Sequence, residues 1–217
     1  MRVVIAGGHG QIALRLQKLL APRGDTAVGI IRNTDHAADL RDISAEPAVL
    51  DLETAGLAEV VAVLDGADAA VFAAGAGPGS GAGRKDTVDR AAAALFAEAA
   101  QQAGVRRHIQ ISAMGLDRAG NPDTEPVFAA YLRAKAAAEE DLRGRDLDWT
   151  ILRPGRLTDD PGTGQVHLTD SVDPGSISRD DVAAVTLALL DDVPRSIGRT
   201  LELVEGHTPI AEAVERL

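Results

Sequence analysis

The sequence predicts a doubly wound α/β fold in three layers, with helices on both faces of a parallel sheet. Short apolar runs alternate with longer amphipathic segments along the 217 residues, a pattern typical of strand–helix–strand crossovers. Runs such as Val3–Ala6 and Ala69–Ala73 are continuously apolar, which indicates strands buried on both faces. No linker or repeat interrupts the pattern, so we expect one domain over residues 1–217.

The apolar runs and the amphipathic segments give the expected elements in chain order. Strands are expected at Val3–Ala6, Ala27–Ile31, Ala48–Leu50, Ala69–Ala73, His108–Ser112, Thr150–Leu152 and Thr200–Val204. Helices are expected at Gln11–Leu20, Ala55–Leu64, Lys85–Ala103, Val127–Arg143 and Asp180–Asp191. A short last helix is expected to start with Thr208 as its cap and Pro209 at its first position.

Composition restricts the function classes. The net charge of −11 argues against a nucleic-acid surface, which needs clustered Lys and Arg. The chain has no cysteine, and its five histidines (His9, His36, His108, His167 and His207) lack the short spacings of metal ligands, so we expect no metal site. No apolar run approaches the ~20 residues of a membrane span or the core of a signal peptide. We therefore expect a cytoplasmic protein with a small-molecule partner and no membrane partner; the sequence leaves open whether it is a homo-oligomer.

The stretch "VVIAGGHGQIA" places three glycines where the first strand passes into the first helix. Gly7 permits the tight turn, Gly10 lets the backbone approach a pyrophosphate, and Ala13 allows the helix to pack close to the strand. The first N–H groups of that helix would then face the phosphates. The turn therefore predicts dinucleotide binding by residues 7–12, namely Gly7, Gly8, His9, Gly10, Gln11 and Ile12.

The end of the second expected strand indicates which dinucleotide is preferred. An NAD site usually has a carboxylate there, whereas this chain has Arg32 followed by Asn33. A guanidinium pairs with a 2′-phosphate, so we predict NADP, with NADPH preferred over NADH. Asp51 and Leu52 follow the third strand, where a polar and an apolar group could flank the adenine.

The only tyrosine, Tyr131, lies four residues before Lys135, one of only three lysines. On a helix the two side chains share one face. A phenol needs a nearby cation to exchange protons at neutral pH, so we expect Lys135 to lower the pKa of Tyr131. Ser112, at the end of the fifth expected strand, could hydrogen-bond a substrate oxygen.

Longer blocks then resemble a known family. "AGGHGQIA", "VFAAGAG", "AGVRRHIQISAMG", "YLRAKAAAEEDLRGRDLDWTILRPGRLTDDPGTG" and "ISRDDVAAVTLALL" resemble the atypical short-chain dehydrogenases/reductases with a minimal, Rossmann-like NAD(P)-binding domain. NmrA-like and flavin/biliverdin-reductase-like proteins are similar, and members often carry the label epimerase or dehydratase.

The resemblance implies roles for particular residues. Ser112, Tyr131 and Lys135 match the catalytic trio of the family, and the ammonium of Lys135 could also hydrogen-bond the nicotinamide ribose. Ala73, Ala74 and Gly75 would lie along the cofactor, and Arg153, Pro154 and Gly155 at its nicotinamide end. The chain departs from the family pattern in having Ala13 at the third glycine position and only a minimal C-terminal region for substrate.

These observations favour an NADP(H)-dependent reductase that passes hydride to a small carbonyl, quinone or flavin-like acceptor. Two alternatives remain open: an epimerase or dehydratase that retains its NAD(P), and a redox sensor that binds NADP(H) without turnover. Substrate contacts are expected from three loops, Gly77–Lys85, Leu116–Phe128 and Arg156–Val166.

Overall fold

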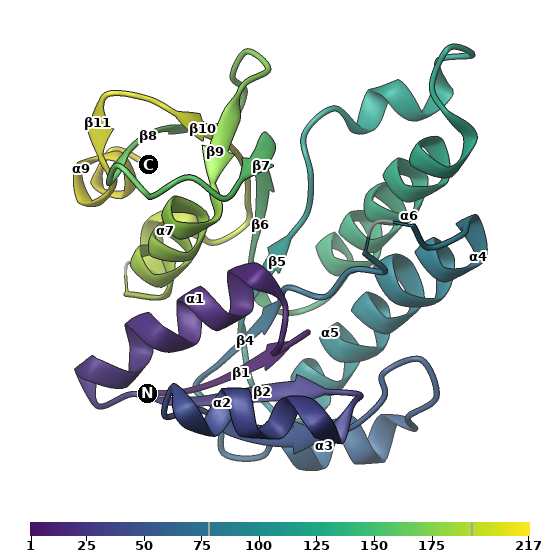
Figure 1. Cartoon of the computed structure of the whole chain (residues 1–217), viewed down its shortest axis with the longest axis vertical. Helices are drawn as coiled ribbons and strands as arrows, with labels where there is room; N and C mark the ends of the chain where they lie inside the picture. The colour runs from purple at the N-terminus through teal and green to yellow at the C-terminus, as the bar shows by residue number, and fades with distance from the viewer. Residues whose placement is uncertain (78, 192) are drawn as a thin grey trace.

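The computed structural model describes residues 1–77, 79–191 and 193–217 and is built on one large twisted sheet (Figure 1). The strand order within these residues is β11-β8-β10-β6-β5-β4-β1-β2-β3. From β3 to β10 every neighbouring pair is parallel, whereas β8 runs antiparallel to both β10 and β11. The predicted doubly wound parallel sheet is confirmed.

The strands of the large sheet are β1 (Arg2–Ala6), β2 (Thr26–Ile31), β3 (Glu46–Val49), β4 (Ala69–Phe72), β5 (Arg107–Ile111), β6 (Asp148–Pro154), β8 (Gln165–Thr169), β10 (Arg199–Glu205) and β11 (Thr208–Pro209), and a separate parallel pair joins β7 (Arg156–Thr158) to β9 (Ser176–Ser178). The α-helices are α1 (Gln11–Leu20), α2 (Ala37–Asp42), α3 (Leu57–Leu64), α4 (Ala82–Arg84), α5 (Ala93–Gln102), α6 (Pro126–Arg143), α7 (Arg179–Asp191), α8 (Val193–Ser196) and α9 (Ile210–Glu215). Short 3₁₀ turns are η1 (Ala21–Arg23), η2 (Thr34–His36) and η4 (Leu116–Gly120), and η3 (Lys85–Ala92) is a π-helix.

The sheet separates two apolar cores, because successive side chains of a strand point to opposite faces. On β1, Val3 and Ile5 join the core that includes α1 and α7, and Val4 and Ala6 join the core that includes α3 and α5. Figure 1 shows α1 and α7 on one side of the strands and α5 and α6 on the other. The predicted three layers are confirmed.

Three features differ from the sequence-based expectation. The segment expected as one helix over 85–103 begins as the π-helix η3 and becomes α-helical only at Ala93. Thr208 and Pro209 form the edge strand β11, and Pro209 is the N-cap of α9 rather than its first residue. The sequence did not predict α2 or the strands β7, β8 and β9, because these are short and partly polar.

The parallel strands place the candidate site at their carboxyl ends, which all meet at one edge of the sheet. The glycine turn follows β1, residues 73–75 follow β4, and Ser112 follows β5. The β7–β9 pair is held against this edge: the N–H of Gly155, just before β7, donates to the carbonyl oxygen of Leu203 on β10 at 2.9 Å. Pro78, in the predicted 77–85 loop, lies outside the described residues.

Candidate active site

The glycine turn has the backbone geometry that the sequence predicted. Gly7 adopts φ +77°, a region that favours glycine, and a Cβ there would lie 2.7 Å from the Cα of Ala74. Gly10 is the N-cap of α1, and no side chain caps this helix. The turn therefore leaves a bare backbone and open N–H groups at a helix N-terminus, which fits a pyrophosphate.

Gly8 is required by packing. Its N–H donates to the carbonyl oxygen of Ile30 at 2.8 Å, and a Cβ on it would lie 2.5 Å from the Cα of Gly29. This glycine pair brings the turn into contact with β2. Gly8 therefore faces the sheet and is not among the residues that line the adjoining cavity.

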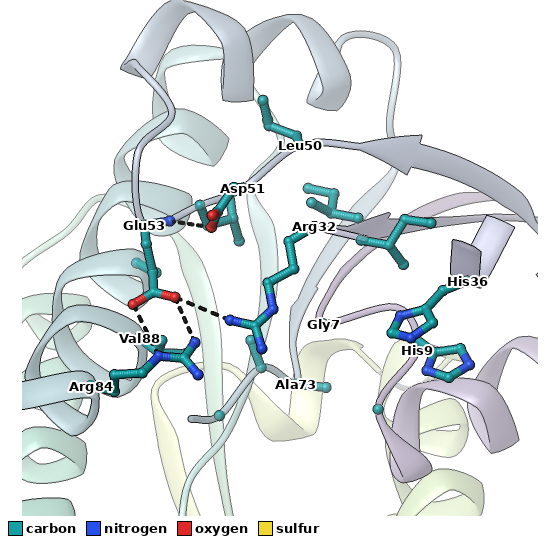
Figure 2. Close-up of a pocket in the computed structure, with 17 residues that line it drawn as sticks. Gly7, His9, Arg32, His36, Leu50, Asp51, Glu53, Ala73, Arg84 and Val88 are labelled. Carbon is teal, nitrogen blue, oxygen red and sulfur yellow. Dashed lines mark hydrogen bonds and ion pairs between the residues drawn. The ribbon is translucent and has the colours of Figure 1, made fainter. Parts of the chain in front are cut away.

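A cavity of 240 Å³ adjoins the turn at the carboxyl ends of β1 to β4 (Figure 2). Its walls include most residues predicted to bind the cofactor, namely Gly7, His9, Gly10, Arg32, Asp51, Leu52, Ala73, Ala74 and Gly75. Ile30, Ile31, His36, Leu50, Glu53, Arg84, Val88 and Ala92 complete them. Apolar strand ends on one wall and charged groups on another suit a nucleoside carrying phosphates.

Other residues predicted to bind the cofactor have different partners. The side chain of Gln11 accepts a hydrogen bond from Arg15 at 2.7 Å, and Ile12 packs against the core. The Asn33 side chain accepts from the N–H of Asp35 at 3.0 Å and so caps η2. Gln11 and Ile12 can still offer backbone N–H groups as the first residues of α1.

Arg32 shares an acceptor with a second arginine that the sequence did not indicate. Arg32 Nη1 donates to Glu53 Oε2 at 3.4 Å, and Arg84 Nη2 donates to the same oxygen at 2.6 Å. The hydrogen bonds from Arg84, and then that from Thr87, hold the pKa of Glu53 below its usual range. Figure 2 shows both guanidinium groups beside this carboxylate at one end of the cavity.

Two histidines stand together elsewhere on the cavity wall. The rings of His9 and His36 are stacked, with centroids 3.7 Å apart, and His9 Nε2 lies 2.7 Å from Asp39 Oδ2. In Figure 2 the pair lies on the other side of Arg32 from Glu53. The His9 ring is therefore held by its neighbours at the edge of the glycine turn.

A second cavity, of 480 Å³, opens beside the ends of β5 and β6. Its walls are Ser112, Ala113, Met114, Gly115, Arg118, Phe128, Tyr131, Pro154, Gly155, Arg156, Leu157, Pro174 and Gly175. Ser112 and Tyr131 of the predicted trio line it together, as do Pro154 and Gly155. Two of the three predicted substrate loops contribute wall residues, and Lys85, at the end of the third, lies near the ring of Tyr131.

Tyr131 is half-buried on α6, and two lysines lie near its ring. Lys85 Nζ is 5.4 Å from the centroid of the phenol ring, and Lys135 Nζ is 5.9 Å from it. The pKa of Tyr131 is nevertheless raised, first by burial and then by the charge of Asp89. The prediction that Lys135 lowers this pKa is therefore wrong, and the phenol keeps its proton at neutral pH.

The charge of Lys135 is engaged by a buried carboxylate. Lys135 Nζ lies 3.3 Å from Asp89 Oδ1 and donates to the carbonyl oxygen of Ile111 at 3.2 Å. Asp89 is fully buried in the π-helix η3, and its other oxygen accepts from the N–H of Ala76 at 3.2 Å. Burial lowers the pKa of Lys135, and the charge of Asp89 opposes that shift.

Ser112 belongs to a second buried charge network. Its hydroxyl lies 2.6 Å from Oε1 of Glu139, a fully buried residue on α6. Arg153 donates two hydrogen bonds to the same carboxylate, at 2.9 and 2.6 Å, and Arg143 donates a third at 2.8 Å. Arg153 is therefore bound to Glu139 and does not line the second cavity, whereas the oxygen of Ser112 is held at its wall.

Sequence reasoning missed Glu53, Arg84, Asp89 and Glu139. Asp89 and Glu139 are buried charges on helices, and Glu53, in the turn after β3, lies 31 residues before Arg84 of α4. Only the fold brings each of them to its partner. Across the described residues, no group of three His, Cys, Asp or Glu could hold a metal ion, and no helix is long and apolar enough to cross a membrane.

Comparison with known proteins agrees with this geometry. A model of the NAD(P)H-binding family matches residues 7–193. The chain is 37% identical over 218 residues to Uncharacterized sugar epimerase YhfK of Bacillus subtilis, and the match covers all of both chains. A solved structure from Bacillus halodurans, described as a putative NAD-dependent epimerase/dehydratase, is 34% identical with a TM-score of 0.90 over all of both chains. The oxidoreductase ylbE from Lactococcus lactis is 26% identical with a TM-score of 0.83, over 100% of this chain and 96% of the other.

The family match begins at the glycine turn and includes both cavities, the Tyr131–Lys135 helix and the strand that ends in Pro154. The cofactor class is therefore a nicotinamide dinucleotide. This chain belongs to the NAD(P)H-binding family, within the atypical single-domain short-chain dehydrogenases/reductases.

Proposed function

We propose that this protein is an NADPH-dependent reductase that passes hydride to a small carbonyl, quinone or flavin-like acceptor. The observation that supports it best is the shared cavity of Ser112 and Tyr131, beside the sheet edge that carries the glycine turn. The first cavity would hold the adenosine and phosphate end of the cofactor. The second would hold the acceptor, next to the nicotinamide.

The bound nicotinamide would supply the hydride, and the side chains of this chain would handle the proton. Tyr131 carries its proton at neutral pH, as an ordinary phenol does, and burial and then Asp89 raise its pKa further. It is therefore suited to donate that proton to the oxygen of a carbonyl as the carbon is reduced. The Ser112 hydroxyl donates its single proton to Glu139, so to orient the same substrate oxygen it would have to turn that proton into the cavity. Lys135, paired with Asp89, would stabilise the phenolate that remains and give it a proton, which the lysine would regain from solvent.

The preference for NADPH rests on the charges around Arg32. Arg32 and Arg84 bring two positive charges to the adenosine end, and both of them pair with the single carboxylate of Glu53. A 2′-phosphate would meet a pair of guanidinium groups there, whereas a free 2′-hydroxyl would leave one of them without a charge partner.

The test combines binding with turnover. Calorimetric titration of the cofactor-free protein with NADPH and NADH should show tighter binding of NADPH, and Arg32→Asp should reverse the order. Tyr131→Phe should reduce NADPH oxidation by carbonyls by about 10²–10⁴-fold while leaving NADPH affinity unchanged. Full residual activity in Tyr131→Phe would remove the phenol from the mechanism.

An epimerase is the alternative that the name of the Bacillus subtilis relative suggests. It would retain its cofactor through purification and consume no NADPH. The second cavity favours a reductase, because Met114, Phe128, Leu157 and two prolines give it apolar walls, whereas a sugar needs many hydrogen-bonding side chains.

A further inference from the structure

The charged residues of the second cavity are all of one sign. Its walls carry Arg118 and Arg156 and no aspartate or glutamate. The chain as a whole has 33 acidic and 22 basic residues and a net charge of −11. A cavity whose charged wall residues are both cations is therefore the opposite of what the acidic composition alone would give.

Neither guanidinium has a carboxylate partner within the described residues, although most arginines of this chain form ion pairs. Arg118 instead lies over the ring of Phe128, 5.6 Å from its centroid, and its chain packs close to Gly115. Phe128 is itself 39% exposed and stacks on Tyr131 with centroids 5.9 Å apart. Arg118, Phe128 and Tyr131 thus form a continuous wall from the guanidinium to the phenol.

Arg156 comes from a different element, the strand β7, whose backbone is fixed. The N–H of Arg156 donates to the carbonyl oxygen of Gly175 at 2.9 Å, and β7 pairs with β9 over three residues. The two arginines therefore reach the cavity from two independent segments, η4 and β7. Guanidinium groups left without partners at a cavity are suited to carboxylates and phosphates, which they bind through paired hydrogen bonds.

We infer that the substrate of this cavity is an anionic carbonyl compound: an apolar or aromatic body that carries a carboxylate or phosphate group. The oxyanion binds Arg118 and Arg156 at the rim, the apolar body lies along Phe128 and Met114, and the carbonyl reaches Tyr131 and Ser112. This inference rests on the proposed function for the position of the carbonyl. The anion site itself rests only on the cavity and its charges. The negative charge of the whole protein repels such a substrate at a distance, which explains why two cations are needed at the entrance.

The experiment measures binding to the protein saturated with NADP⁺, so that its result does not depend on turnover. The probes are 4-formylbenzoate, the neutral 4-formylbenzamide of the same shape, and 4-formylphenyl phosphate, each titrated by calorimetry into the wild type, Arg118→Gln, Arg156→Gln and Arg41→Gln. Arg41 is an exposed arginine on α2 that lines neither cavity, so its variant changes the net charge equally.

We expect the wild type to bind at least one anionic probe about tenfold or more tightly than the amide, since hydrogen bonds to charged groups are the strong ones. Arg118→Gln and Arg156→Gln should each lose most of that preference, and Arg41→Gln should keep it. The larger of the two anionic preferences identifies carboxylate or phosphate as the natural group. Equal affinity for anionic and neutral probes, or a preference that survives both cavity substitutions, overturns the inference.

NADPH oxidation in the presence of the same probes is measured separately. An arginine-dependent preference without hydride transfer would support the anion site and overturn the reductase. Reduction of the neutral amide as efficient as that of the anionic probes would support the reductase and overturn the anion site.

Discussion

Asp89→Asn should destabilise the protein strongly and do so in a pH-dependent way. Asp89 and Lys135 are 0% and 4% exposed, with 3.3 Å between Nζ and Oδ1. At an effective dielectric constant of about 20, charges at that distance attract by about 5 kcal/mol. In Asp89→Asn the buried Lys135 has no carboxylate charge beside it, and it can avoid being a buried unpaired cation by releasing its proton. That release costs about 5 kcal/mol at pH 7, because its ordinary pKa is about 10.4. We therefore expect a loss of about 3–5 kcal/mol in the free energy of unfolding.

The sign of the pH dependence follows from the same pair. Burial lowers the pKa of Lys135 in the folded state, and Asp89 opposes this shift, so the variant lowers it further. The unfolded chain then binds more protons than the folded one until the pH passes the ordinary lysine pKa. Stability of Asp89→Asn should therefore rise with pH relative to the wild type, and its deficit should shrink between pH 7 and pH 10.

Urea unfolding at several pH values measures both effects. The matched control is Asp86→Asn, on the same π-helix, where an exposed carboxylate pairs with Arg90; its stability should stay close to that of the wild type. The reasoning is refuted if Asp89→Asn is no less stable than Asp86→Asn, or if its deficit grows as the pH rises.

Three further predictions test other parts of the structure. Gly8→Ala should destabilise the fold by about 1–3 kcal/mol, because its Cβ would lie 2.5 Å from the Cα of Gly29; urea unfolding checks this, and an unchanged midpoint contradicts it. The pKa of buried His108 is lowered to about 3, first by burial. Wild-type stability should therefore fall as the pH drops from 6.5 towards 3, by at most about 1.4 kcal/mol per pH unit, and His108→Phe should flatten that profile. Glu139→Gln should weaken the hydrogen bonds from Arg153 and reduce turnover without changing NADPH affinity. Steady-state kinetics measure the turnover, and calorimetric titration measures the affinity.

The residues that the sequence placed correctly are those whose signal is local. The strand at residues 3–6 and the helix at 11–20 were predicted because apolar runs and amphipathic periods are properties of a short segment. The Tyr131–Lys135 pair was visible because four residues on one helix bring two side chains together.

The electrostatics of the site could not be predicted in this way. Asp89 meets Lys135 from a helix 46 residues earlier in the chain, and Glu139 meets Ser112 across 27 residues. A single sequence holds no information on such pairings, so the pKa of Tyr131 was predicted in the wrong direction. The strands β7 and β9 escaped notice for a related reason: "RLT" and "SIS" are too short and too polar to show a period.

In the π-helix η3, a single hydrogen-bond pattern fixes the positions of two charged side chains at the active site. Lys85 and Asp89 both lie within its eight residues, one beside Tyr131 and the other beside Lys135. In an α-helix each residue turns the chain by 100°, and a π segment behaves as an insertion into that pattern. Deleting one residue between Lys85 and Asp89 would restore the α-helical hydrogen-bond pattern. It would also rotate Lys85 and the residues before it about the helix axis. The length of this stretch therefore constrains the active site as well as its composition does, and a one-residue deletion can alter the chemistry while Lys85 and Asp89 themselves are kept.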